Sequence, residues 1–177
     1  MIENRYAITV EGLKETSGKI LMHTPRFRKV IIGTPVAIVL LLVLLHLIQP
    51  EISVWILLAV GAALLAYVFY LFRKTPSQMS ENIFADMKKK FDEPIYHTKL
   101  TDGGILVLDQ DDEGEDDRIF PFSTVRNVFG TEHFIVVITT YNKAVTFRRD
   151  SFVTGNEAAL LAQFRDHCPQ AKFGKGI

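Results

Sequence analysis

The sequence predicts a membrane protein of the α+β class, with a two-helix transmembrane hairpin and a mostly antiparallel β-sheet or barrel domain closed by a C-terminal helix. Three observations predict it. Two long runs without a formal charge occupy residues 30–48 and 52–72, short alternating segments recur from residue 95 onward, and an apolar stripe at helical spacing lies near the C-terminus. At 177 residues the chain has room for one domain of ordinary size beside such a hairpin.

The two uncharged runs have the length of membrane spans, since a helix needs about 20 apolar residues to cross a hydrocarbon core of about 30 Å. Val, Ile and Leu fill fourteen of the nineteen positions at 30–48, which outweighs Gly33, Pro35 and His46. The alternatives are buried core helices or a signal peptide. A signal peptide would begin nearer the N-terminus and end in a cleavage site of small residues, whereas 29 mostly polar residues come first. Two spans are therefore expected.

The residues around the spans predict their orientation. Only Gln49, Pro50 and Glu51 separate the two runs, so the spans form an antiparallel hairpin. The basic residues that flank the hairpin on one side are Arg26, Arg28 and Lys29 before it and Arg73 and Lys74 after it. Positive charge stays in the cytoplasm, so both termini are expected there. The single cysteine, Cys168, forms no internal disulfide, which agrees with a reducing compartment.

Small and polar residues within the spans leave alternatives open. The small residues spaced four apart are Ala59 with Ala63, Ala62 with Ala66, and Gly33 with Ala37. Such pairs allow close helix packing, either within the hairpin or between copies of the chain. His46 marks either a solute pathway or an interfacial residue, and its place three residues from the turn favours the interface. Because neither predicted span contains a charged residue, the hairpin is expected to be an anchor and not a solute pathway.

Residues 73–92 are expected to form a basic amphipathic helix of their own. Thr75 suits the N-cap and Pro76 the first helical position. The apolar residues that recur on one side are Ile83, Phe84, Met87 and Phe91. Lys88, Lys89 and Lys90 either lie against anionic headgroups or are simply solvated while the apolar side packs on the following domain.

Residues 93–177 are expected to form the β domain. The Asp102-Gly103 pair predicts a type I′ hairpin between strands at 95–100 and 105–108, and Pro121 marks an edge strand or a bulge. Further strands continue to residue 147, with a turn at Tyr141-Asn142. A final helix at about 155–168 follows a capping box of Thr154 and Glu157. Its apolar stripe consists of Leu160, Leu161, Phe164 and Cys168.

Residues 1–29 are expected to be a cytoplasmic strand and helix. The alternation in Tyr6–Val10 predicts the strand, and residues 12–23 the helix. This strand is one candidate to complete the sheet built by residues 95–149, on the other side of the hairpin in sequence.

An acidic run at residues 109–117 places seven carboxylates in nine positions around Gly114. Counted from Asp109 it resembles an EF-hand loop through position six, but position twelve, which needs a bidentate carboxylate, is Phe120. A solvated hairpin loop explains the run without calcium, so no metal site is predicted there, and weak cation binding stays open.

Several of these segments resemble the bacterial YcxB-like family: GGILVL, FPFSTVRNV followed by HFIVVITT, and AVTFRRDSF before the last helix. The resemblance covers nearly the whole chain and implies a two-span hairpin with a pleckstrin-homology-like domain at the bacterial inner membrane. It differs at Phe122, where the family often has Trp, and in the long acidic run. Arg148 and Arg149 match a position that is commonly basic in the family, so they are candidate partner-binding residues together with Pro121.

The sequence contains no recognised catalytic motif, and neither an enzyme activity, a cofactor nor a nucleic-acid partner is expected. His97, His133, His167 and Cys168 have no metal-ligand spacing. The expected function is a binding or scaffold module tethered to the bilayer. The alternative is an embedded homo-oligomer that senses or transports a small solute.

The flanking charges generate a topology prediction. Reporters fused after Phe91 and after Ile177 should both be active inside the cell, because positive charge flanks both spans on the same side. Alkaline phosphatase and green fluorescent protein fusions at these two points provide the measurement. A periplasmic C-terminus would contradict the hairpin.

Overall fold

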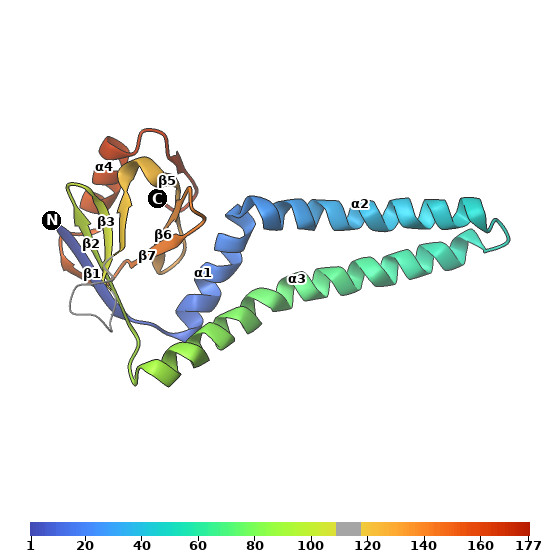
Figure 1. Cartoon of the computed structure of the whole chain (residues 1–177), viewed down its shortest axis with the longest axis horizontal. Helices are drawn as coiled ribbons and strands as arrows, with labels where there is room; N and C mark the ends of the chain where they lie inside the picture. Colours follow the sequence, from blue (N-terminus) through green and yellow to red (C-terminus); the bar gives the residue numbers. More distant parts are fainter. Residues whose placement is uncertain (109–117) are drawn as a thin grey trace. The chain divides into compact units, whose positions relative to one another are not determined.

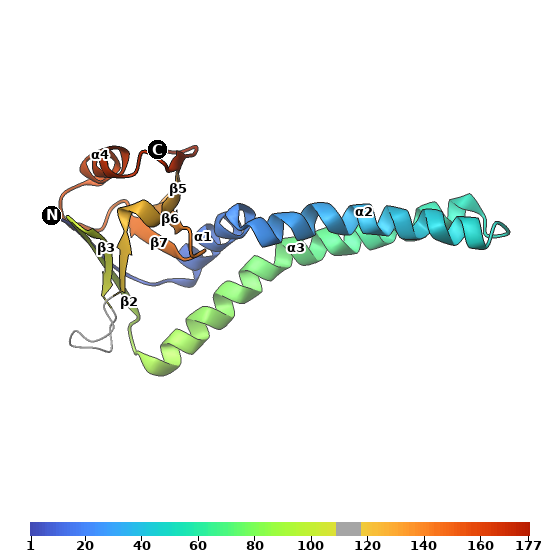
Figure 2. The ribbon, with the colours of Figure 1, turned by 45° about the horizontal axis from the view of Figure 1, so that its top comes forward.

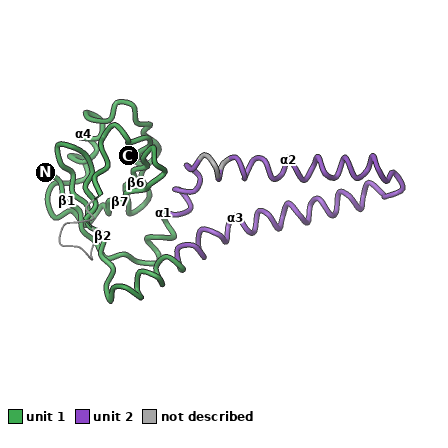
Figure 3. Tube along the Cα trace, viewed as in Figure 1, with its two compact units in different colours: residues 1–16, 81–177 green, residues 17–80 purple. Residues whose placement is uncertain are grey.

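The computed structural model describes residues 1–108 and 118–177, apart from the side chains of Pro25, Arg26 and Arg28. The chain divides into two compact units (Figure 3), one of residues 1–16 and 81–177 and one of residues 17–80. The acidic run at 109–117, and with it the question of calcium, lies outside the described residues.

Along the chain, an N-terminal strand is followed by three successive helices, and strands then predominate up to the last helix (Figure 1). In order they are β1 (Ile2–Ala7), α1 (Val10–His23), α2 (Pro25–Ile48), α3 (Val54–Lys90), β2 (Ile95–Thr101), β3 (Gly104–Leu108), β4 (Arg118–Pro121), the 3-10 turn η1 (Phe122–Thr124), β5 (Val125–Gly130), β6 (Phe134–Thr139), β7 (Ala144–Arg148), β8 (Phe152–Thr154), α4 (Glu157–His167) and β9 (Lys172–Phe173).

The unit of residues 17–80 is a helical hairpin. Figures 1 and 2 show α2 and the first part of α3 side by side and antiparallel. A Cβ atom added at Gly61 would lie 2.6 Å from Leu42 Cδ1, so this glycine allows the close approach of the two helices. Both helices are long and apolar enough to cross a membrane, and 0% of the apolar window in α2 and 11% of that in α3 are buried. The second helix begins at Val54, two residues later than predicted.

The separate helix predicted at 73–92 is wrong, because α3 continues without a break from Val54 to Lys90. Thr75 is not an N-cap. Its Oγ1 donates to the carbonyl of Leu71 at 2.7 Å, one turn earlier in the same helix. Pro76 lies inside the helix, where Ser80 Oγ donates to its carbonyl at 2.8 Å. Thr75 and Pro76 therefore do not start a new helix, because the residues before them are already helical and α3 continues through both.

The other unit contains two mostly antiparallel sheets, and the described strands do not close into a barrel. One sheet has the order β4-β3-β2-β1-β8 and the other β7-β6-β5-β9, where only β9 runs parallel to its neighbour. The N-terminal strand completes the first sheet, as one of the predictions proposed. It spans Ile2–Ala7 rather than 6–10, because Ile2 and Asn4 already point to the buried side.

The core lies between the two sheets and α4. Its largest buried side chains include Leu100, Ile105 and Phe147 from the strands. The predicted helical stripe of Leu160, Leu161, Phe164 and Cys168 is buried against them, which confirms the amphipathic pattern. The predicted cap at Thr154 is wrong. Thr154 ends β8, and Asn156 caps α4 by accepting from the amide of Ala159 at 2.8 Å.

Two hairpin turns fall where the sequence placed them. Asp102-Gly103 joins β2 to β3, but neither residue has the positive φ of a type I′ turn. The positive φ falls instead on Gly104, at +146°, where an added Cβ would lie 2.3 Å from the carbonyl oxygen of Phe120. Between β6 and β7, Asn142 adopts φ 58°.

A buried side chain joins the two sheets through hydrogen bonds to the backbone. Asn4 of β1 is 0% exposed. Its Nδ2 donates to the carbonyl of Arg148 at 2.8 Å, and its Oδ1 accepts from the amide of Arg148 at 2.9 Å. The amide group therefore replaces the missing neighbour strand of β7, whose partner in its own sheet is β6.

Replacing Asn4 tests this joint. Asn4→Leu should lower the free energy of unfolding by about 2–4 kcal/mol, because two backbone groups of Arg148 would be left unpaired. The matched control is Arg5→Leu, which changes an exposed neighbour on the same strand and should cost about 0.5 kcal/mol or less. Thermal unfolding of both purified variants gives the comparison. Equal stability of the two would show that Asn4 does not hold the sheets together.

Candidate binding surface

The side chains that carry acid-base or thiol chemistry are dispersed over the domain. His97 Nε2 lies 2.6 Å from Glu3 Oε1, and His133 Nδ1 lies 3.0 Å from Glu15 Oε2. Cys168 is buried, and burial raises the pKa of its thiol to about 11, which makes it a poor nucleophile. Among the described residues, no three His, Cys, Asp or Glu side chains gather as metal ligands.

The basic residues expected at the membrane surface lie along the helices. Arg73, Lys74 and Lys88–Lys90 are exposed on α3 and Lys29 on α2. Lys74 Nζ lies 5.6 Å from the centre of the Tyr70 ring, while Lys89 pairs with Asp86 at 2.9 Å. Arg26 and Arg28 belong to the first turns of α2, and their side chains are outside the description.

Arg148 and Arg149 are both engaged in contacts within the domain. Arg148 Nε lies 2.8 Å from Asp150 Oδ1. Arg149 contacts the Glu157 carboxylate in the first turn of α4 and the carbonyl of Gly176 in the C-terminal tail. A Cβ atom at Gly130 would meet that guanidinium at 2.4 Å, so the glycine leaves room for it. Arg149 thus links three segments of the fold, a contact that only its tertiary neighbours reveal.

Pro121 lies on an edge strand, as its missing N–H predicted. It ends β4, which pairs with β3 on one side and forms one edge of the five-stranded sheet. The side chain of Ile119 in the same strand is 60% exposed. An edge strand with free backbone groups is a surface that an extended segment of another chain can lengthen.

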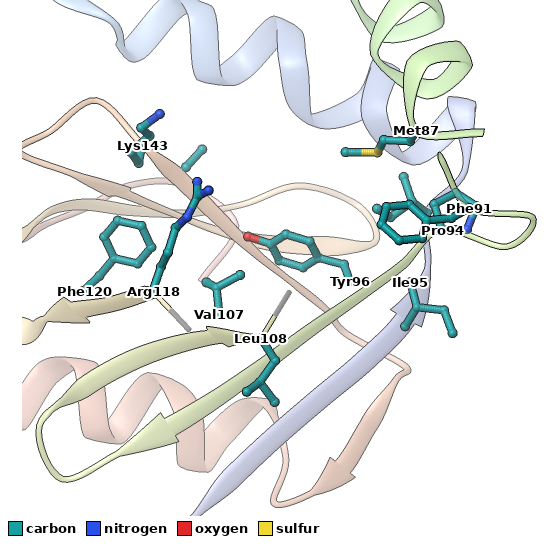
Figure 4. Close-up of a pocket in the computed structure, with 12 residues that line it drawn as sticks. Met87, Phe91, Pro94, Ile95, Tyr96, Val107, Leu108, Arg118, Phe120 and Lys143 are labelled. Carbon is teal, nitrogen blue, oxygen red and sulfur yellow. The ribbon is translucent and has the colours of Figure 1, made fainter. Parts of the chain in front are cut away.

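A pocket of about 270 Å³ lies beside this edge (Figure 4). Its walls come from the end of α3, the start of β2, the facing parts of β3 and β4, and the start of β7. Met87, Phe91 and Pro94 lie at one end, and Arg118 and Lys143 at the other. Met87 and Phe91, from the predicted apolar side of this segment, therefore face the β domain across the pocket, while the contact of Lys88–Lys90 with headgroups stays a prediction.

Sequence reasoning did not find this pocket. The alternation in RIFPF places Arg118 and Phe120 on one face of a strand, which was the only local signal. The pocket also needs the β3–β4 register and the turn before β7, and these are set by tertiary pairing.

No family model matches the sequence, and comparisons with curated proteins and with solved structures find no match either. The resemblance to the YcxB-like family therefore stays a prediction.

The contacts of the two arginines predict different effects on stability. Arg149→Gln should lower the free energy of unfolding by about 1–2 kcal/mol, because it removes a partly buried charged contact between three segments. Arg148→Gln removes a pair with an exposed aspartate and should cost about 0.5 kcal/mol or less. Thermal unfolding of the two variants measures the difference. An Arg149→Gln variant as stable as Arg148→Gln would show that these contacts of Arg149 contribute little to the stability of the fold.

Proposed function

We propose that the chain is a non-catalytic binding module tethered to the cytoplasmic membrane, with both termini in the cytoplasm. The observation that carries the anchor is the apolar surface of α2 and α3, of which little is buried by the protein itself. Such surface costs about 25 cal/mol per Å² in water, which a bilayer removes. The other unit has its own buried core, as a separately packed binding domain requires.

The binding surface in this proposal is the free edge of β4. The strand carries Pro121, exposes Ile119 and adjoins a pocket, so a partner segment would find both backbone groups and a recess for a side chain. Tethering to the bilayer raises the effective concentration of the domain for a partner at the same membrane. A pleckstrin-homology-like fold is part of the same proposal, because antiparallel strands in two sheets precede a final helix.

One observation favours the alternative of an embedded homo-oligomer. An added Cβ at Gly33 would meet nothing within 4 Å, so the Gly33–Ala37 pair is not used by the hairpin as Gly61 is. A second copy of the chain would fit against such a small-residue surface. Solute movement through such an assembly is a separate function from partner recruitment.

Site-specific photocrosslinking in native membranes tests the proposal. A benzophenone amino acid at position 119 should capture one discrete protein, because Ile119 lies on the proposed docking edge. The matched control is position 153, since Val153 is 62% exposed on β8 at the opposite edge of the same sheet. The adduct at 119 should persist when residues 30–72 are exchanged for an unrelated hairpin. Capture only of its own copies, together with solute flux in reconstituted vesicles, would favour the alternative.

A further inference from the structure

The pocket beside β4 opens on the buried side of the five-stranded sheet. Cross-strand partners share a face, and the register places Asn4, Thr98, Val107 and Arg118 in one row. Burial falls along this row, from the fully buried Asn4 and Thr98 through Val107 to the exposed Arg118. Arg118 thus stands at the outer end of the face that elsewhere forms the core, and the pocket continues that face outward.

One end of the pocket is apolar. Met87 near the end of α3 forms it together with Phe91 and Pro94 between α3 and β2, and the ring of Tyr96 and the side chain of Val107 continue the wall (Figure 4). A cavity of about 150 Å³ holds benzene, so by proportion 270 Å³ has room for about ten carbon atoms. That is a medium alkyl chain or the first part of a longer one.

The other end of the pocket is cationic. Arg118 and Lys143 both line it, although one comes from β4 and the other from the turn before β7. Neither forms an ion pair with any carboxylate in residues 1–108 or 118–177. Figure 4 shows the Tyr96 hydroxyl directed toward the Arg118 side. Burial raises the pKa of the Tyr96 hydroxyl.

We propose that this pocket binds a single-chain lipid anion, a carboxylate or phosphate amphiphile whose headgroup meets Arg118 and Lys143 and whose chain lies against Tyr96, Phe91 and Met87. Two cations that share a small pocket repel each other until an anion arrives. A neutral amphiphile would leave these two cations without a counter-charge from any carboxylate in residues 1–108 and 118–177, and an inorganic anion would leave the apolar end in contact with water. The site goes beyond partner recruitment, although it lies in the pocket that would also receive a partner's side chain. The two proposals are tested separately, because labelling of the purified chain in nanodiscs needs no partner protein.

Photoaffinity labelling of the full chain tests the site. The chain is reconstituted in nanodiscs of phosphatidylcholine, which carry no net anionic lipid, and exposed to dodecanoate bearing a diazirine on its chain. Mass spectrometry of the digested protein should find label in peptides that contain residues 87–96 or 118–120. Label in the helices of residues 30–72 reports the probe dissolved in the bilayer and serves as an internal reference.

Two variants should reduce the pocket label relative to that reference. Arg118→Gln with Lys143→Gln should reduce it about five- to tenfold, which is the combined effect of two exposed charges on an anion. Met87→Trp should reduce it by filling the apolar end, and it changes a residue of α3 that lies outside the core between the sheets. The matched control is Arg126→Gln with Lys172→Gln, which removes two exposed cations outside the pocket and should leave the label unchanged. Thermal unfolding verifies that each variant is folded.

Competition by unlabelled ligands identifies the headgroup. Decanoate or decyl phosphate should reduce the labelling of the pocket peptides. The stronger competitor shows whether the pocket prefers a carboxylate or a phosphate headgroup. Decanol should displace the probe at least fivefold less well. Equal competition by decanol, pocket label no greater than that of other exposed peptides, or label unchanged in both pocket variants would each overturn the proposal.

Discussion

The pairing of β1 with β2 is the constraint on which the rest of the structure depends. Ile2 pairs with Leu100 and Ala7 with Ile95, so strands from either side of the helical hairpin in sequence are neighbours in one sheet. β1 also pairs with β8, which makes the N-terminal strand an interior one. If α2 and α3 cross a bilayer, the two chain segments that flank them must lie on the same side. The sheet therefore requires both flanking segments to share one side of such a bilayer, which is one part of what the flanking charges predict.

The central place of β1 also determines which edges stay open. β4 and β8 are the edges of the five-stranded sheet. Asn4 forms hydrogen bonds with the backbone amide and carbonyl of Arg148 in β7, and so joins the second sheet to the first. Because this contact involves the inward face of β1, the row from Asn4 to Arg118 runs from the core to solvent. The pocket at the outer end of that row is a consequence of the way the sheets meet, and a change at Asn4 is expected to reach it.

Local patterns in the sequence predicted the features that depend on segment length and on the spacing of apolar residues. Span length predicted the hairpin, and the stripe at Leu160 and Phe164 predicted the packed face of α4, because burial follows helical period. Thr75 and Pro76 led to the wrong prediction of a separate helix at 73–92, because residues that favour a helix start can also be accommodated inside a longer helix. The cap at Asn156 is local, because Asn156 accepts from the amide of Ala159 three residues later, and the apparent capping box of Thr154 and Glu157 concealed it. The short strand β9 and the pocket instead depend on contacts distant in sequence, which no window of residues contains.

The β1–β2 pairing requires two strands that are far apart in the sequence to meet during folding. β1 is made first but must wait for β2, which begins roughly 90 residues later, and the entropy of closing a flexible loop grows with its length. Antiparallel packing of α2 against α3 returns the chain toward its starting point, so fewer flexible residues separate the strands once the hairpin has formed. Contacts between distant segments are slow to form in small domains. A helical hairpin that forms early would thus bring together the strands whose pairing creates the sheet, its edge at β4 and the pocket beside it.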